Sequence, residues 1–251
     1  MKRTFLKYDK PLLTTMVQAR TPDKIKELID LSSASGAEAF GLQFCKMNEE
    51  HKTKKVYEDL FSYTDKPIYV TNYRYGVNHT KNDDELAEEL CRMAMYGATL
   101  CDVMGDYFDK QPDEVAIDEK AICKQMKLIE NLHKRGSEVL MSSHVLKFIP
   151  AERVIEIALE HQRRGADICK IVTHADTEEE MFENLRIVSL LKKELDIPFL
   201  YLSGGNCRLL RRIGGELGCC MYLCVYEYDE LATRQQPLLK KLKAVRDNID
   251  D

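Results

Sequence analysis

The sequence Gly165-Ala166-Asp167-Ile168-Cys169-Lys170-Ile171-Val172 has the apolar pattern of a β-strand and carries one lysine. Strand side chains alternate between two faces, so Ile168, Lys170 and Val172 share one face. If that face lines the interior of a closed barrel, the lysine lies where water is scarce, and burial favours its neutral form. A neutral amine is a nucleophile for carbonyl groups. The alternative interpretation is an edge-strand lysine that reaches back to solvent.

Seven other short apolar runs resemble this one. Together the strand candidates are residues 12–17, 37–44, 67–73, 98–103, 137–144, 166–173, 197–203 and 219–225. Amphipathic segments of helical length accompany them at residues 22–33, 53–63, 83–95, 118–134, 150–163, 177–193, 205–217 and 235–247. This alternation predicts βαβ units and a parallel sheet. Because no Gly-x-Gly-x-x-Gly fingerprint is present, we predict an α/β fold of the (βα)8 TIM-barrel type rather than a doubly wound nucleotide-binding fold.

The composition indicates one ordinary globular domain covering residues 1–251, with 44% hydrophobic and 31% charged residues. The net charge of −5 gives no reason to expect nucleic acid or an anionic membrane as a partner. No apolar run approaches the roughly 20 residues that span a bilayer. The nine cysteines form no Cys-x-x-Cys pair, so we expect no metal and a reduced, cytoplasmic protein.

In barrels of this type the active site lies at the carboxyl ends of the strands. His144 ends the fifth strand candidate, next to the strand of Lys170, and an imidazole near a Schiff-base lysine could move protons on the adjacent carbon. Other polar candidates at strand ends are Gln43, Asn72, Arg74 and Ser203. Of the doublet Arg211-Arg212, only one side chain is expected to face inward. We expect the remaining histidines, His51, His79, His133 and His161, on helix surfaces or in loops.

Three segments follow one another along the chain: Glu138-Val-Leu-Met-Ser-Ser-His144, Gly165-Ala-Asp-Ile-Cys-Lys170-Ile, and Ser203-Gly-Gly-x-x-Arg-x-x-x-Arg212-x-x-Gly-Glu216. Together they resemble type I 3-dehydroquinate dehydratase, a class I aldolase-like (βα)8 enzyme of the shikimate pathway of aromatic amino acid biosynthesis. The resemblance covers nearly the whole chain and is strongest from residue 137 onward.

The resemblance implies a cofactor-free elimination of water from a small oxo-acid. Lys170 would form an iminium with the substrate ketone, and His144 would remove the neighbouring proton and protonate the departing hydroxyl. Arg212 matches the arginine that binds the substrate carboxylate, and Gln236 matches a glutamine in the loop after the eighth strand. Members of the family often form dimers, so the resemblance also implies a homodimer, although no interface is evident in the sequence.

The sequence departs from the family where substrate hydroxyls are held. Gln43 and Cys45 stand where the family has a glutamate and an arginine, and Arg74 matches only if one residue is inserted. Met104 replaces the carboxylate that orients the histidine, unless Asp106 substitutes for it. We therefore predict a Schiff-base lyase acting on 3-dehydroquinate or a related oxo-acid with fewer hydroxyls. A class I aldolase-type C–C lyase and a non-catalytic metabolite-binding member remain as alternatives.

Overall fold

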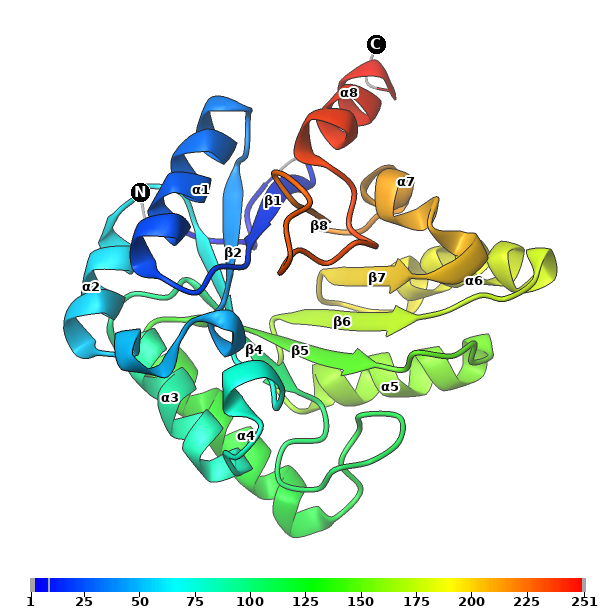
Figure 1. Ribbon diagram of the computed structural model, residues 1–251. Coiled ribbons are helices and arrows are strands. Elements are labelled where there is room, and N and C mark those ends of the chain that lie inside the picture. Colours follow the sequence, from blue (N-terminus) through cyan, green and yellow to red (C-terminus); the bar gives the residue numbers. More distant parts are fainter. Residues whose placement is uncertain (1–2, 9, 250–251) are drawn as a thin grey trace.

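The computed structural model describes residues 3–8 and 10–249, which form a (βα)8 barrel (Figure 1). Its eight strands are β1 (Leu12–Val17), β2 (Ala39–Gln43), β3 (Ile68–Thr71), β4 (Leu100–Met104), β5 (Glu138–His144), β6 (Ile168–Thr173), β7 (Phe199–Ser203) and β8 (Met221–Cys224). Neighbours pair in parallel in the order β7-β6-β5-β4-β3-β2-β1-β8. The backbone amide of Cys220, just before β8, donates a hydrogen bond to the carbonyl of Phe199 in β7 (2.9 Å), which links these two strands. The predicted fold class is confirmed, with strand ends differing by one or two residues.

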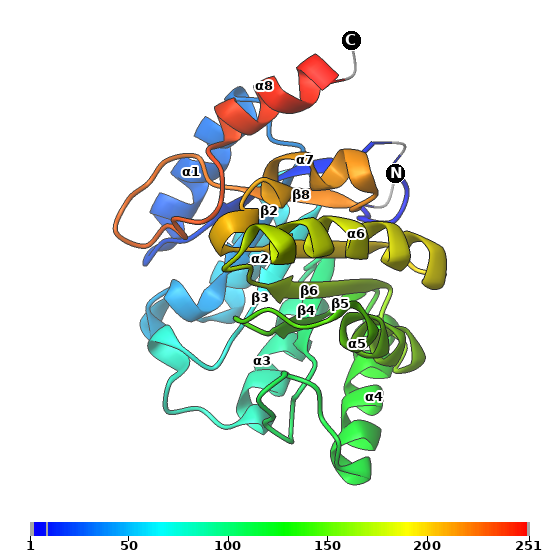
Figure 2. The ribbon, with the colours of Figure 1, turned by 90° about the vertical axis from the view of Figure 1, so that its right-hand side faces the viewer.

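The helices form the outer layer around the strands (Figures 1 and 2). They are α1 (Pro22–Ala34), α2 (Lys54–Ser62), α3 (Asp83–Met95), α4 (Glu119–Lys134), α5 (Ala151–Arg163), α6 (Glu178–Glu194), α7 (Leu210–Leu217) and α8 (Leu239–Ile249). Thr177 and Glu180 form a capping box at the start of α6, because the side chain of each accepts a hydrogen bond from the backbone amide of the other. Both views show α8 beside α1, so the last and first helices are neighbours in the outer ring.

Two helices differ from the sequence prediction near the site. The segment expected to be helical from residue 205 begins instead with a short 3-10 turn, Gly205–Cys207, and α7 starts only at Leu210. The last helix starts at Leu239 rather than at residue 235, so the residues after β8 form a longer loop. Both changes alter which side chains the loops at the carboxyl ends of the strands present to the interior.

Interior side chains fill the barrel below the site. Tyr69 of β3 and Met16 of β1 lie in this core, both less than a tenth exposed. Gly41 of β2 makes room for them, because a Cβ there would lie 2.2 Å from the Met16 sulfur and 3.1 Å from the Tyr69 ring. Glycine at this position therefore leaves room in the barrel interior for Tyr69, whose hydroxyl accepts a hydrogen bond from the Lys170 amine (3.1 Å).

All nine cysteines are free thiols, and no described helix is long and apolar enough to cross a membrane. His161, predicted on a helix surface, is completely buried between α5 and the barrel. Its ring nitrogens contact the Ser143 hydroxyl (3.0 Å) and the Cys169 thiol (3.4 Å). Burial, together with the nearby charge of Arg164, lowers the pKa of His161 to about 3, so it is neutral in the folded protein at neutral pH.

We expect this histidine to make the protein acid-sensitive. In the unfolded chain its pKa is near 6.5, so between pH 6.5 and 3 the unfolded state binds a proton that the folded state excludes. The free energy of unfolding therefore decreases as pH falls below 6.5, by about 2 kcal/mol at pH 5 from this group. Urea unfolding of wild type and His161→Gln between pH 7 and 5 measures it. The variant should lose less stability over this range, and parallel curves would contradict the assignment.

Candidate active site

A cavity of about 590 Å³ opens at the carboxyl ends of the strands. Its polar and charged lining comprises Gln43, Arg74, Lys110, Glu114, His144, Lys170, Arg211, Thr233, Gln235 and Gln236, with the aromatic residues Tyr73 and Tyr75. The apolar lining comprises Met16, Met104, Leu146, Val172, Leu202 and Leu223. The cavity is thus built where the barrel rule places an active site, and it holds both Lys170 and His144.

Lys170 lies in this cavity with 4% of its surface exposed. Its amine donates hydrogen bonds to the hydroxyls of Tyr73 (2.7 Å) and Tyr69 (3.1 Å) and to the Asp102 carboxylate (3.2 Å). The sequence predicted the barrel-facing lysine but not these partners. The amine is buried in a polar cage rather than in an apolar surrounding, and it is held in one place by three groups from two neighbouring strands and their ends.

Asp102 is the anion of this cage and is almost completely buried. It accepts hydrogen bonds from Ser142 (2.5 Å), Tyr73 (2.6 Å) and Tyr69. Burial would raise the pKa of Asp102, but the charge of Lys170 and these hydrogen bonds outweigh it and hold the pKa below its usual value. The carboxylate is therefore ionised at neutral pH and compensates the lysine charge.

His144 lies one layer above Lys170, because the register of β5 and β6 pairs Ser142 with Lys170 and His144 with Val172. Glu114 orients it: the carboxylate accepts from the His144 backbone amide (2.7 Å) and lies 2.9 Å from Nδ1. Although burial opposes it, the hydrogen bond from His144 lowers the pKa of Glu114, so the carboxylate is ionised and can only accept. Nδ1 therefore carries the proton, and Nε2 is left as the basic nitrogen.

Asp106, the candidate replacement for the family's carboxylate that orients the histidine, does not orient His144. Its carboxylate binds Arg74 (2.6 Å), whereas Glu114 reaches His144 from the loop between β4 and α4. Glu114 has φ of 48°, a left-handed conformation that costs energy in a residue with a side chain. Its carbonyl accepts a hydrogen bond from Ser143 (2.8 Å), which fixes this conformation. No strand or helix periodicity extends into this loop, so residue patterns alone could not identify Glu114.

The arginine that enters the cavity is Arg211, not Arg212. Arg211 is 6% exposed, and its Nε donates to the Ser203 carbonyl (2.8 Å). Arg212 instead donates to the Arg208 carbonyl (2.9 Å) on the outer side of α7 and lines a different, smaller hollow. The expectation that only one of the two arginines faces inward therefore holds, but Arg212, which the family resemblance matched to the carboxylate-binding arginine, lies outside the cavity.

Arg211 has no carboxylate partner among the described residues. Besides Ser203, only the Gln235 amide oxygen accepts from it, at 3.4 Å. Burial, added to the charge of the adjacent Arg212, lowers the pKa of Arg211 to about 10, so the guanidinium is still charged at neutral pH. A buried, uncompensated cation that faces a cavity is a site for an anionic group of a ligand.

Two glutamines line the cavity as predicted, but among residues 3–8 and 10–249 only one of them has a hydrogen-bond partner for its side-chain amide oxygen. Gln43 accepts from Gln18 and donates to the Tyr75 hydroxyl (2.6 Å). The Oε1 atom of Gln236 is buried and has no hydrogen-bond partner among the described residues. The amide of Gln43 is therefore already hydrogen-bonded within the wall of the cavity, whereas the amide oxygen of Gln236 can still accept a hydrogen bond from a ligand.

Asn72 and Ser203 point away from the cavity, contrary to the prediction that they bind substrate. Asn72 donates to Glu89 of α3 (2.8 Å), and the Ser203 hydroxyl accepts from Asn184 of α6 (3.0 Å). Both side chains alternate outward from their strands, toward the helices. Their hydrogen bonds attach the helical layer to the barrel.

Arg74 lines the rim of the cavity, but its guanidinium is engaged by the protein itself. It binds Asp83 through two hydrogen bonds (2.7 and 2.8 Å) and Asp106 through another (2.6 Å). These contacts join the loop after β3 to α3 and to the loop after β4. Arg74 therefore anchors the substrate-side loops, and a role in binding substrate would require it to leave these partners.

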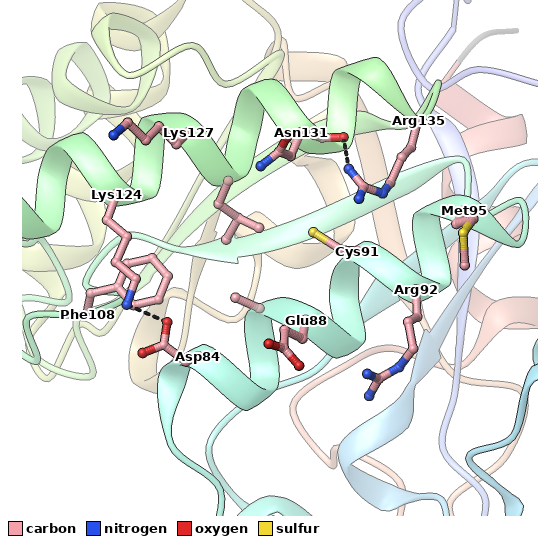
Figure 3. Close-up of a pocket in the computed structure, with 12 residues that line it drawn as sticks. Asp84, Glu88, Cys91, Arg92, Met95, Phe108, Lys124, Lys127, Asn131 and Arg135 are labelled. Atoms are coloured by element: carbon pink, nitrogen blue, oxygen red, sulfur yellow. Dashed lines mark hydrogen bonds and ion pairs between the residues drawn. The ribbon is translucent and has the colours of Figure 1, made fainter.

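A second hollow, of about 430 Å³, lies between α3 and α4 on the outer layer (Figure 3). Lys124 pairs with Asp84 across it, and Arg135 is turned back to the Asn131 carbonyl (2.9 Å). Apart from Phe108 in the loop after β4, its lining comes from α3 and α4 and the residue that follows α4, and it includes neither Lys170 nor His144. We therefore assign the site to the central cavity.

The fold and this cavity define the class of protein: a (βα)8 barrel whose cavity, at the carboxyl ends of its strands where barrel enzymes have their active sites, contains a buried lysine. Residues 14–221 match the family model described as type I 3-dehydroquinase, and the chain belongs to this family. No curated protein matches the sequence.

The barrel is similar to solved structures of 3-dehydroquinate dehydratases. The type I enzyme from Clostridium difficile, solved with covalently modified comenic acid, superposes with a TM-score of 0.81 at 17% identity over 99% of this chain and 98% of that one. The enzyme from Geobacillus kaustophilus has a TM-score of 0.83 at 14% identity, covering 99% and 95%. The enzyme from Aquifex aeolicus has a TM-score of 0.70 at 18% identity, covering 94% and 98%. At these identities the likeness extends to the fold, with a divergent sequence.

Proposed function

We propose that this protein is a hydro-lyase that removes water from a cyclic oxo-acid, 3-dehydroquinate or a relative of it, through an iminium on Lys170. The observation that carries the proposal is a single cavity holding a caged lysine, a carboxylate-oriented histidine and an uncompensated arginine. Family membership supports dehydration as the reaction class.

The groups divide the work as follows. The Lys170 amine attacks the ketone, and the resulting iminium withdraws electrons from the neighbouring carbon. Nε2 of His144 takes the proton from that carbon, because Glu114 holds the ring with Nδ1 protonated. The same nitrogen then gives its proton to the departing hydroxyl. Asp102 lies beside the Lys170 nitrogen, and its carboxylate stabilises the positive charge of the iminium.

Arg211 supplies the recognition of an acid. Its guanidinium is fixed by the Ser203 carbonyl and has remaining N–H groups with no acidic partner among the described residues. A substrate carboxylate bound there would be compensated inside the protein, where a charge-assisted hydrogen bond is strong. Gln236 lies in the same wall and provides a neutral polar contact.

The remaining wall favours a substrate with fewer hydroxyls than 3-dehydroquinate. Gln43 is occupied by Gln18 and Tyr75, and Arg74 by two carboxylates. The apolar residues Met16, Met104 and Leu223 stand in the same cavity. Hydroxyls placed against such side chains would lose their hydrogen bonds to water without replacement.

Borohydride trapping tests the proposal. The protein is mixed with 3-dehydroquinate, 3-dehydroshikimate, comenic acid and linear oxo-acids, reduced, and analysed by intact mass and peptide mapping. We expect one adduct, located on Lys170 and lost in Lys170→Ala, and release of the dehydrated product from the unreduced mixture. The matched control is Lys110→Ala, which removes an exposed amine at the rim of the same cavity.

The products separate the alternatives. An adduct on Lys170 accompanied by C–C cleavage products would replace dehydration by the aldolase-type reaction. No adduct with any probe, in a protein that circular dichroism shows to be folded, would contradict the iminium and leave a metabolite-binding role.

A further inference from the structure

Tyr73 occupies a position that the mechanism above does not use. Its hydroxyl accepts from the Lys170 amine (2.7 Å) and donates to Asp102 (2.6 Å), so it bridges the two charged groups of the cage. Its ring lines the cavity and meets the His144 ring edge-on, with centroids 5.2 Å apart. Tyr73 is therefore the phenol that touches both the reacting nitrogen and the space where a ligand binds.

We propose that Tyr73 is a catalytic residue that carries the proton between Lys170 and Asp102 and delivers it to the carbinolamine oxygen during iminium formation. The inference rests on the proposed function and assigns its first steps to a separate acid–base group. His144 would then act only at the carbon and the leaving hydroxyl.

The steps balance without any added reactant. The Lys170 ammonium gives one proton to the Tyr73 oxygen while Tyr73 gives its own proton to Asp102, which leaves a neutral amine and a neutral carboxyl. The amine nitrogen bonds to the ketone carbon, and one nitrogen proton moves to the former carbonyl oxygen. The proton on Asp102 then returns through Tyr73 to this hydroxyl, the C–O bond breaks, and water leaves. The products are an iminium and the regenerated Asp102 carboxylate.

Tyr69 and His144 fit this role less well. Tyr69 also binds Lys170 and Asp102, but it is completely buried below them and does not line the cavity. No hydrogen bond joins His144 to Lys170 in the described part of the chain, and its Nδ1 is engaged by Glu114. Burial and the charge of Asp102 raise the pKa of Tyr73 far above its usual value, so it stays a phenol and can donate.

The test separates iminium formation from the later chemistry. Exchange of the ketone oxygen with ¹⁸O-labelled water and rapid-quench borohydride trapping report iminium formation, with 3-dehydroquinate, 3-dehydroshikimate and pyruvate as probes. We expect Tyr73→Phe to slow both by about 100-fold, as for loss of a general acid–base group. Tyr69→Phe removes the other tyrosine hydroxyl that contacts Lys170 and Asp102. It should slow oxygen exchange and trapping by less than about tenfold, as for loss of one hydrogen bond. His144→Ala should keep rapid exchange but lose dehydration.

Thermal unfolding of each variant checks that it remains folded. Tyr73→Phe and Tyr69→Phe with equal exchange rates, or exchange lost in His144→Ala rather than in Tyr73→Phe, would overturn the inference while the proposed function stands. If wild type shows neither exchange nor adduct with any probe, the proposed function fails, and the inference fails with it.

Discussion

Asp102→Asn is expected to destabilise the protein by about 3 kcal/mol, because it removes the partner of a buried charge. Lys170 and Asp102 are both about 95% buried or more, with their charged atoms 3.2 Å apart. In the variant the ammonium would lie beside a neutral amide, with its full desolvation cost uncompensated. Urea unfolding measures the effect as a lower midpoint with an unchanged slope.

A double variant controls for the loss of packing. Lys170→Met combined with Asp102→Leu replaces both charges by apolar groups, and such replacements are often neutral for stability. We expect it to recover most of the stability lost in Asp102→Asn while remaining inactive. If Asp102→Asn were as stable as wild type, the ion pair would not hold the cage together.

The second large effect is expected at the arginine doublet. Arg211→Ala should weaken binding of an oxo-acid by about 100-fold, because truncating one partner of a buried charge pair costs about 2–5 kcal/mol. Arg212→Ala is the matched control and should change binding by less than about twofold, since its guanidinium bonds the Arg208 carbonyl outside the cavity. Concentration dependence of trapping on Lys170, or calorimetric titration, measures both.

A ligand comparison isolates the charge. The methyl ester of the trapped oxo-acid should bind wild type and Arg211→Ala about equally, because it has no carboxylate to lose. If Arg212→Ala lost binding and Arg211→Ala did not, the family's arginine would keep its sequence position, and the assignment to Arg211 would be wrong.

The barrel was predictable because its signals are local. Eight apolar runs alternate with amphipathic segments, and each of these produces one strand or helix within a few residues. The starts of α7 and α8 were predicted too early. There a 3-10 turn and a loop held by tertiary hydrogen bonds replace helix that the residue pattern alone would allow.

The site was predictable where strand alternation fixes a side chain. Lys170 and His144 face the interior because each stands at an inward position of a central strand. The same parity, applied along β3, could have identified Tyr69 and Tyr73, which are two steps of two residues apart. Asn72 alternates with Tyr73 and points to the opposite face, so the sequence prediction placed its side chain on the wrong face.

By itself the sequence determined the (βα)8 barrel and the two cavity residues to which the proposed chemistry is assigned, Lys170 and His144. Only the tertiary structure decided what surrounds them: Asp102 and Tyr73 on the lysine, Glu114 on the histidine, and Arg211 in the cavity. The physical reason is that strand and helix patterns depend on neighbours along the chain. The partners of a buried charge come from distant strands and loops, and desolvation selects them only when the barrel closes.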